Sequence, residues 1–154
     1  MKTSTSKISN YISGVICVVF LTGCQGPQTP DTIHTSKAEK SSLEKIRSFL
    51  DGGGDVNFAD SKGDTELHKA SFKGYKYVAE TLLERGANPK AKNENGRTPL
   101  HYAAMYGRTK LAELLLGEEI DVNAADNEGF TPLYWAKKYS RNEVSDLLMK
   151  NGGK

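Results

Sequence analysis

Residues 98–107 read Thr-Pro-Leu-His-Tyr-Ala-Ala-Met-Tyr-Gly, and the rest of the chain is best interpreted from this stretch. Threonine is favoured just before a helix, because its side chain accepts a hydrogen bond from a free backbone N–H. Pro99 then stands at the first helical position, where a missing N–H has no consequence. Gly107 is the type of residue that ends helices in a left-handed conformation. The stretch therefore predicts a short helix between Thr98 and Gly107.

The same pattern occurs three times at a fixed spacing. Similar stretches begin at Thr65, Thr98 and Thr131, so the period is 33 residues. Other positions keep this register: Ala70, Ala103 and Ala136; Gly63, Gly96 and Gly129; Leu82-Leu83, Leu115-Leu116 and Leu148-Met149. A period of this length indicates stacked repeats, each of which buries its apolar side against its neighbours.

This pattern resembles the ankyrin repeat family, with its Thr-Pro-Leu-His-x-Ala signature and its 33-residue period. The resemblance covers residues 41–154 and implies an all-α solenoid of helix-turn-helix units with β-turn tips. About three full repeats are expected, at residues 63–95, 96–128 and 129–154. A capping helix at residues 41–52, with Ser42 as its N-cap, is expected to precede them.

In the first repeat Glu66 replaces the signature proline, and three further departures lie in the last two repeats. Glu119 stands where the other repeats have glycine in a left-handed turn, at a cost of about 1–2 kcal/mol unless the helix ends early at Gly117. Tyr134 replaces the signature histidine and Ser140 replaces the helix-ending glycine in the last repeat. We therefore expect the last repeat to be the loosest.

The N-terminus resembles a bacterial lipoprotein signal peptide at residues 1–23. Two lysines precede an apolar run of ten residues, 12–21, which is shorter than the roughly 20 residues of a membrane-spanning helix. The run ends in Leu21-Thr22-Gly23-Cys24, which resembles the lipobox; an ordinary secretory signal with a chance cysteine is the alternative. The resemblance implies lipidation of Cys24 and anchoring in the bacterial cell envelope. Gln25 after the cysteine implies the outer membrane, facing the periplasm.

Removal of the signal changes the charge and the cysteine count. Without Lys2 and Lys7, 19 basic residues face 19 acidic ones, so the basic stripe that nucleic-acid binding needs is missing, and we expect no nucleic acid as partner. Cys17 leaves with the signal and Cys24 carries lipid, which leaves no cysteine for a disulfide. Residues 24–40 are rich in proline and polar residues and predict a flexible tether.

His68 and His101 have two interpretations. The family resemblance implies that each accepts a hydrogen bond from the threonine of its own repeat and fixes neighbouring backbone. A metal site needs several converging ligands, and the sequence offers three histidines and no free cysteine. We therefore expect a structural role, with no metal and no cofactor.

The resemblance also implies a binding surface, since ankyrin stacks bind other proteins through their turn tips and the concave face of their first helices. Aromatic and methionine side chains, which binding hot spots favour, gather there in the second and third repeats. Tyr102 and Trp135 are one period apart, so we expect them side by side. Packing between helices is the alternative for each ring. The candidate partner-binding residues are Phe72, Arg97, Tyr102, Met105, Tyr106, Phe130, Trp135 and Tyr139.

These observations favour a monomeric protein-protein interaction module tethered to a membrane by lipid. An immunity or inhibitor lipoprotein that neutralises a periplasmic toxin or enzyme is the alternative. An enzyme is a remote third possibility, because the sequence has no Ser/His/Asp set, no glycine-rich phosphate loop and no metal-ligand spacing. We accordingly assign no catalytic residue.

Overall fold

The computed structural model describes residues 36–154. The expected signal peptide at residues 1–23, the lipid attachment at Cys24 and most of the tether at 24–40 lie outside the described residues. Within them the chain forms helices joined by loops, with one isolated antiparallel bridge between Ala59 and Thr65. None of the described helices is long and apolar enough to cross a membrane.

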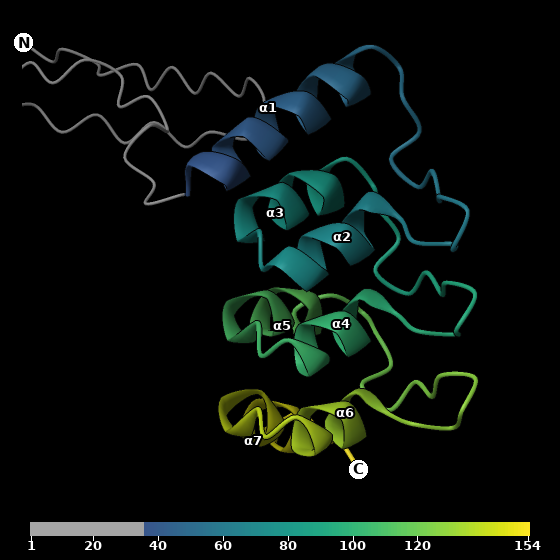
Figure 1. Ribbon diagram of the computed structural model, residues 1–154, viewed down its shortest axis with the longest axis vertical. Helices are drawn as coiled ribbons and strands as arrows, with labels where there is room; N and C mark the ends of the chain where they lie inside the picture. The colour runs from purple at the N-terminus through teal and green to yellow at the C-terminus, as the bar shows by residue number, and fades with distance from the viewer. Residues whose placement is uncertain (1–35) are drawn as a thin grey trace, which may run out of the picture. The chain divides into compact units, whose positions relative to one another are not determined.

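The helices stack in two layers (Figure 1). The layer on the side of the projecting loops, here called the inner helices, contains α2 (Glu66–Lys73), α4 (Pro99–Met105) and α6 (Pro132–Lys138). The other layer, the outer helices, contains α1 (Lys37–Asp51), α3 (Lys76–Glu84), α5 (Thr109–Leu116) and α7 (Asn142–Lys150). Neighbouring helices of one layer pack against each other, and α2–α3, α4–α5 and α6–α7 form antiparallel pairs. The predicted all-α ankyrin solenoid is confirmed.

The inner helices begin as the sequence predicts. Thr65, Thr98 and Thr131 are extended N-cap residues, and Pro99 and Pro132 stand at the first helical position of α4 and α6. An extended N-cap residue and a pre-set proline φ start the helix at a defined residue. Each inner helix therefore presents its side chains in the same register as the others.

Equivalent apolar residues of successive repeats form the core. Leucines at two positions of the period are almost fully buried, and small residues lie between the helices. Truncating such a leucine costs about 2–5 kcal/mol. The aligned core residues are Leu67, Leu100 and Leu133; Leu82, Leu115 and Leu148; Ala79 and Ala112; and Ala70, Ala103 and Ala136.

Arginine side chains link successive repeats on the side away from the loops. Arg108 Nε donates to the carbonyl oxygen of Phe72 at 3.1 Å, and Arg141 Nε donates to that of Met105 at 3.1 Å. A Cβ atom added to Gly107 would lie 2.9 Å from Arg141 Cδ. Glycine is therefore favoured at position 107 for two reasons: its φ is 64°, and a Cβ atom would occupy the space that the Arg141 side chain fills.

The capping helix begins earlier than predicted. We expected it at residues 41–52 with Ser42 as N-cap, but α1 begins at Lys37, and the side chain of Ser36 accepts from the N–H of Glu39 at 3.1 Å. Glu39 is buried, and its Oε1 accepts from the N–H of Tyr77 at 2.9 Å. This bond satisfies a free donor in the first turn of α3, so the extra turn of α1 is held by a contact 38 residues away.

The departure at Glu119 carries no left-handed strain. Helix α5 ends at Leu116 with Gly117 as its C-cap, and among the described non-glycine residues Ser140 has the positive φ, 54°. The N–H of Ile120 bonds to the carbonyl of Glu118 at 2.8 Å instead of reaching back into the helix. The early helix end that we considered is thus the one adopted. The looseness of the last repeat stays a prediction.

Candidate protein-binding surface

The loops between the repeats are rigid turns. In each loop one side chain, that of Asp60, Asn93 or Asp126, accepts hydrogen bonds from the N–H groups two and four residues further on, at 2.9–3.1 Å. Successive tips also bond through their backbone: Glu94 N donates to the carbonyl of Lys62 at 3.0 Å, and an equivalent bond recurs one repeat later. These bonds hold the tips in place, and the loops project along one edge of the inner-helix layer (Figure 1).

Three exposed aromatic rings lie at the C-terminal ends of the inner helices, one in each repeat. Phe72 is 42% exposed, Tyr106 37% and Tyr139 44%. The rings of Phe72 and Tyr106 meet edge to face, with centroids 4.5 Å apart. We call these three residues the aromatic strip. All three were candidate partner-binding residues, and the structure leaves each of them accessible to a partner.

Tyr102 is held by the tips and lies under the aromatic strip. Its hydroxyl donates to Asp64 Oδ2 at 3.3 Å and accepts from Asn93 Nδ2 at 3.1 Å. Burial of the hydroxyl, together with the nearby Asp64 carboxylate, raises the pKa of Tyr102 above its ordinary value. Its ring stacks on that of Tyr106, with centroids 6.4 Å apart and planes 8° from parallel. Tyr102 thus supports the strip more than it extends it.

Trp135 is buried at the candidate surface. It is 4% exposed, and its indole N–H donates to Asp126 Oδ2 at 2.9 Å. The Arg97 guanidinium lies 4.6 Å from the centre of the Trp135 rings and the Lys138 ammonium 4.5 Å. A buried carboxylate needs hydrogen-bond donors, and this requirement draws the indole inward. This burial favours packing, the alternative interpretation for each ring, and a direct binding role for Trp135 stays a prediction.

Asp126 is the centre of this buried cluster. Burial opposes its ionisation, but hydrogen bonds from the N–H groups of Phe130 and Glu128, from Trp135 and from Arg97 outweigh that effect, and the pKa of Asp126 is lowered. The carboxylate therefore remains charged at neutral pH and fixes the third tip onto α6.

The remaining candidates, Arg97, Met105 and Phe130, are half-buried. Arg97 Nε lies 3.4 Å from Asp126 Oδ2, and its NH2 group 3.3 Å from Glu128 Oε1, so its charge is already paired. The ring of Phe130 stacks on that of Tyr134, with centroids 3.9 Å apart. These contacts favour packing for Arg97 and Phe130, with part of each side chain still open.

Sequence reasoning missed three exposed aromatic residues. Tyr134 is 39% exposed at the position of the signature histidine, Phe58 is 62% exposed on the loop before α2, and Phe49 is 48% exposed on α1. The periodic alignment offered a signal for Phe58, because Ala91 and Ala124 occupy the equivalent positions. Phe58 is therefore a large exposed side chain at a position where the next two repeats have alanine.

His68 and His101 are buried hydrogen-bonding links between repeats. His101 Nδ1 lies 3.0 Å from Thr98 N and 2.9 Å from Thr98 Oγ1, and its Nε2 lies 3.1 Å from the carbonyl oxygen of Phe130. His68 makes the same set of bonds to Thr65 and to the carbonyl of Arg97. Since Nδ1 accepts from the backbone, Nε2 carries the proton and donates. Both ring nitrogens are thus engaged, as the family resemblance implied.

Metal coordination finds no support at the histidines. Within residues 36–154 no group of three or more His, Cys, Asp or Glu side chains is arranged to hold a metal ion. Burial lowers the pKa of His68 and His101 below the ordinary value, against the opposing effect of the carbonyl acceptors. Both rings are therefore neutral in the folded chain near pH 7.

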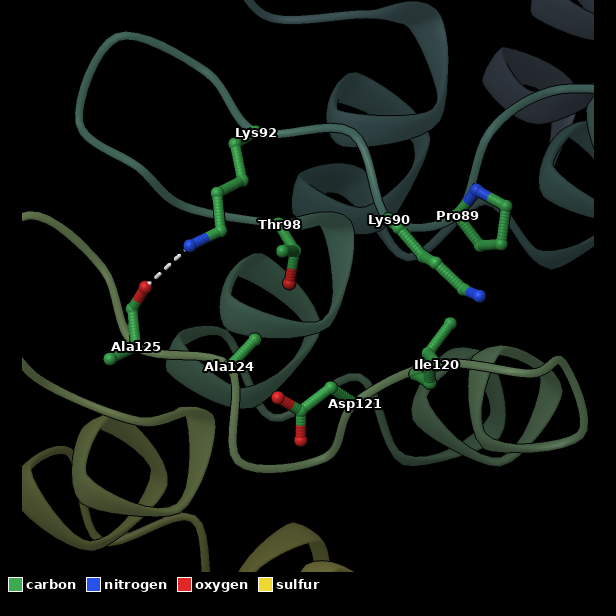
Figure 2. A pocket seen from close by; sticks show the side chains of 8 residues that line it. All are labelled: Pro89, Lys90, Lys92, Thr98, Ile120, Asp121, Ala124 and Ala125. Carbon is green, nitrogen blue, oxygen red and sulfur yellow. Dashed lines mark hydrogen bonds between the residues drawn. The ribbon is translucent and has the colours of Figure 1, made fainter.

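A hollow of about 310 Å³ lies at the base of the second and third loops, away from the aromatic strip. Figure 2 shows that Lys92 closes one side of it, where its Nζ donates to the carbonyl of Ala125 at 2.9 Å. The buried hydroxyl of Thr98 is committed to His101. The polar groups that line the hollow therefore either form hydrogen bonds within the protein or, like those of Lys90 and Asp121, are exposed to solvent. They do not converge on one point. The lining residues are Pro89, Lys90, Lys92, Thr98, Ile120, Asp121, Ala124 and Ala125.

Comparison with known proteins places the chain in a family. The profile described as "Ankyrin repeat" matches residues 62–94, and the profile described as "Ankyrin repeats (3 copies)" matches residues 86–154. Together they cover residues 62–154, more than half of the 154 residues, and the chain belongs to the ankyrin repeat family. Ankyrin repeats imply a protein-protein interaction module.

A curated relative agrees with this assignment. The "Ankyrin repeat and KH domain-containing protein mask-1" of Caenorhabditis elegans is 42% identical to the chain over 62 residues. The alignment covers 40% of this chain and 2% of the relative's length. The likeness therefore concerns the repeats and does not extend to the relative's other parts.

Proposed function

We propose that this chain is a monomeric protein-binding module, tethered by lipid to the bacterial envelope, which binds a partner protein through the aromatic strip on its inner helices and through its turn tips. The observation that carries the proposal is the strip itself: Phe72, Tyr106 and Tyr139 are exposed at the C-terminal ends of three successive inner helices, with Phe72 one position earlier in the 33-residue period than the two tyrosines. Exposed aromatic rings in a row are typical of binding hot spots.

The surroundings of the strip favour binding without large rearrangement. Tyr102 beneath it is fixed by Asp64 and Asn93, and Trp135 stacks on Tyr139 with ring centroids 6.0 Å apart. A surface that is already ordered loses little conformational entropy when a partner binds. The strip therefore offers its apolar area at low entropic cost.

The tether is the part of the proposal that depends on sequence. Leu21-Thr22-Gly23-Cys24 after an apolar run supports lipid attachment at Cys24, with the outer membrane facing the periplasm as the proposed location. Replacement of Cys24 by Ala tests this. The expected result is a precursor that is neither processed nor acylated, whereas a mature acylated variant in the membrane fraction would overturn the tether.

Site-specific photo-crosslinking tests the binding surface. A photoreactive phenylalanine analogue is placed at Tyr106 or at Tyr139, and in a control protein at Lys90, which lies in the loop at the hollow. The expected result in envelope extract is one adduct common to positions 106 and 139 and absent at position 90. Adducts at position 90 alone would contradict the proposal.

The identity of the crosslinked protein then separates the two roles that the sequence left open. A captured toxin or hydrolase whose activity falls when the chain binds would establish the inhibitor role. A captured structural or assembly protein with unchanged activity would establish the scaffold role.

A further inference from the structure

The two helix layers differ in charge. The inner helices α2, α4 and α6 together carry four lysines, Lys69, Lys73, Lys137 and Lys138, and one carboxylate, Glu66. The outer helices α1, α3, α5 and α7 together carry seven Lys and Arg residues and eight Asp and Glu residues, so their charge is close to balanced. The inner helices thus carry a net positive charge that the outer helices lack.

The excess positive charge of the inner helices is unpaired. Lys69 Nζ lies 2.9 Å from Glu66 Oε1 and 3.4 Å from Asp60 Oδ2, so this lysine and the single carboxylate neutralise each other. Lys73, Lys137 and Lys138 form no ion pair with any carboxylate in the described part of the chain.

Two of these lysines lie beside the aromatic strip and contact rings. Lys73 follows Phe72 in the chain, and its Nζ lies 5.5 Å from the ring centre of Tyr75. Lys138 precedes Tyr139, and its Nζ lies 4.5 Å from the ring centre of Trp135. A cation–π contact at an exposed site is weak, so both ammonium groups remain available to a carboxylate.

Two carboxylates of the loops beside the inner helices, those of Asp64 and Asp126, are turned inward. Asp64 bonds to Tyr102 and Asn93, and Asp126 bonds to Trp135 and Arg97. These two carboxylates accept hydrogen bonds from donors within the protein, whereas Lys73 and Lys138 are exposed at the surface. A partner on this face therefore meets cations and aromatic rings together.

We propose that the partner contacts the inner helices through an acidic segment in which aspartate or glutamate residues alternate with apolar ones. The inference rests on the proposed function and specifies the partner's chemistry. Its carboxylates pair with Lys73 and Lys138, and its apolar side chains pack on Phe72, Tyr106 and Tyr139. Complementary charge of this kind steers the encounter and fixes the register of the segment.

Selection from a random peptide library tests the proposal. The full chain is immobilised, the selected peptides are sequenced, and their binding is titrated by the fluorescence of Trp135, the chain's single tryptophan, which Lys138 contacts. The expected peptides carry net negative charge and apolar residues. Peptides that are neutral or basic, or the absence of any selected peptide, would overturn the inference.

Charge variants sharpen the test. Lys73→Met together with Lys138→Met removes both charges but keeps the aliphatic cover over the rings, and we expect about tenfold or greater loss of peptide affinity. Lys110→Met with Lys150→Met, on the outer helices, is the matched control and should leave affinity unchanged. Equal affinities of the two pairs would overturn the inference, and melting temperatures of all variants verify folding.

Two further measurements separate the possible failures. If Tyr106→Ala abolishes peptide binding but the double lysine variant binds with unchanged affinity, the inference of an acidic partner is overturned and the proposed binding surface stands. If neither change alters the affinity, the proposed surface is overturned as well. An oligothymidylate of equal charge should bind at least about tenfold more weakly than the peptides, because a neutral domain without a basic stripe holds nucleic acid poorly, and equal binding would contradict a protein partner.

Discussion

The indole N–H of Trp135 donates a 2.9 Å hydrogen bond to the buried carboxylate of Asp126, nine residues earlier in the chain. This bond ties the third turn tip to the helix that follows it. Because the indole of Trp135 is buried against this carboxylate, little of its surface is accessible to a partner. Replacement of Trp135 should therefore lower the stability of the fold more directly than it lowers partner affinity.

Replacing Trp135 by Phe should lower the free energy of unfolding by about 1–3 kcal/mol, because Asp126 loses a donor in a buried position. Urea denaturation at neutral pH measures the change. Tyr139→Phe is the control: its ring is 44% exposed, and the effect should stay within about 0.5 kcal/mol. A Trp135→Phe variant of full stability that has lost its partner would restore Trp135 as a direct binding residue.

Truncation of Tyr106 should weaken partner binding and leave stability almost unchanged, the reverse of the effect expected for Trp135. Tyr106→Ala removes a 37% exposed ring from the centre of the aromatic strip, and an anchoring aromatic is worth about 2 kcal/mol or more of binding energy. Calorimetric titration with the captured partner measures this loss, and thermal melting should change little. Lys90→Ala serves as the control that leaves affinity intact. Unchanged affinity in Tyr106→Ala would move the binding surface elsewhere.

Stability should depend on pH through His68 and His101. Burial holds the pKa of both below the ordinary 6.5. Between the lowered native pKa and 6.5 the unfolded chain binds protons that the folded chain does not, so the free energy of unfolding falls as the pH falls below 6.5. The pKa of Asp126 is lowered from 3.8, so its contribution is lost at lower pH, where the carboxylate becomes protonated.

Urea titrations between pH 7.5 and about 5 measure this slope, which should correspond to at most about two protons. His101→Ala should lower stability by about 1–3 kcal/mol at pH 7.5, because buried partners lose their bonds, and it should reduce the slope by the share of one proton. An unchanged slope in His101→Ala would show that this ring does not titrate with unfolding.

Gly107→Ala should destabilise more than Gly129→Ala. Both glycines have positive φ, 64° and 84°, so each alanine incurs about 1–2 kcal/mol of backbone strain. The added Cβ meets Arg141 Cδ at 2.9 Å in the first case and nothing within 4 Å in the second. Combining Gly107→Ala with Arg141→Ala should recover part of the difference, as a double-mutant cycle measures. Equal costs for the two single variants would show that Arg141 moves aside freely.

The sequence predicted the repeats well because their determinants are local and periodic. Thr98, Pro99 and Gly107 act within one helix, so their spacing was enough to place α4. The start of α1 was missed because it depends on the bond between Glu39 and the backbone of Tyr77, on another helix. No pattern within α1 marks that partner.

The candidate site was harder to predict, since exposure depends on neighbouring repeats. Tyr102 and Trp135 occupy the same position of the period, yet one is half-buried and the other almost fully buried. The difference comes from Arg97, Asp126 and Lys138, which enclose the indole from three separate segments. Tyr106 and Tyr139, at the helix ends, keep the exposure that their position implied.

The hydrogen bonds of His68 and His101 also have a consequence for the gain and loss of whole repeats during evolution. His68 donates to the carbonyl of residue 97 and His101 to that of residue 130, so each link reaches the same place in the following repeat. Excision of residues 97–129 would set Phe130 directly after Gly96, where its carbonyl could receive the bond of His68. Gain or loss of one 33-residue unit by recombination therefore leaves every such link with a partner, and the stack can evolve by whole units.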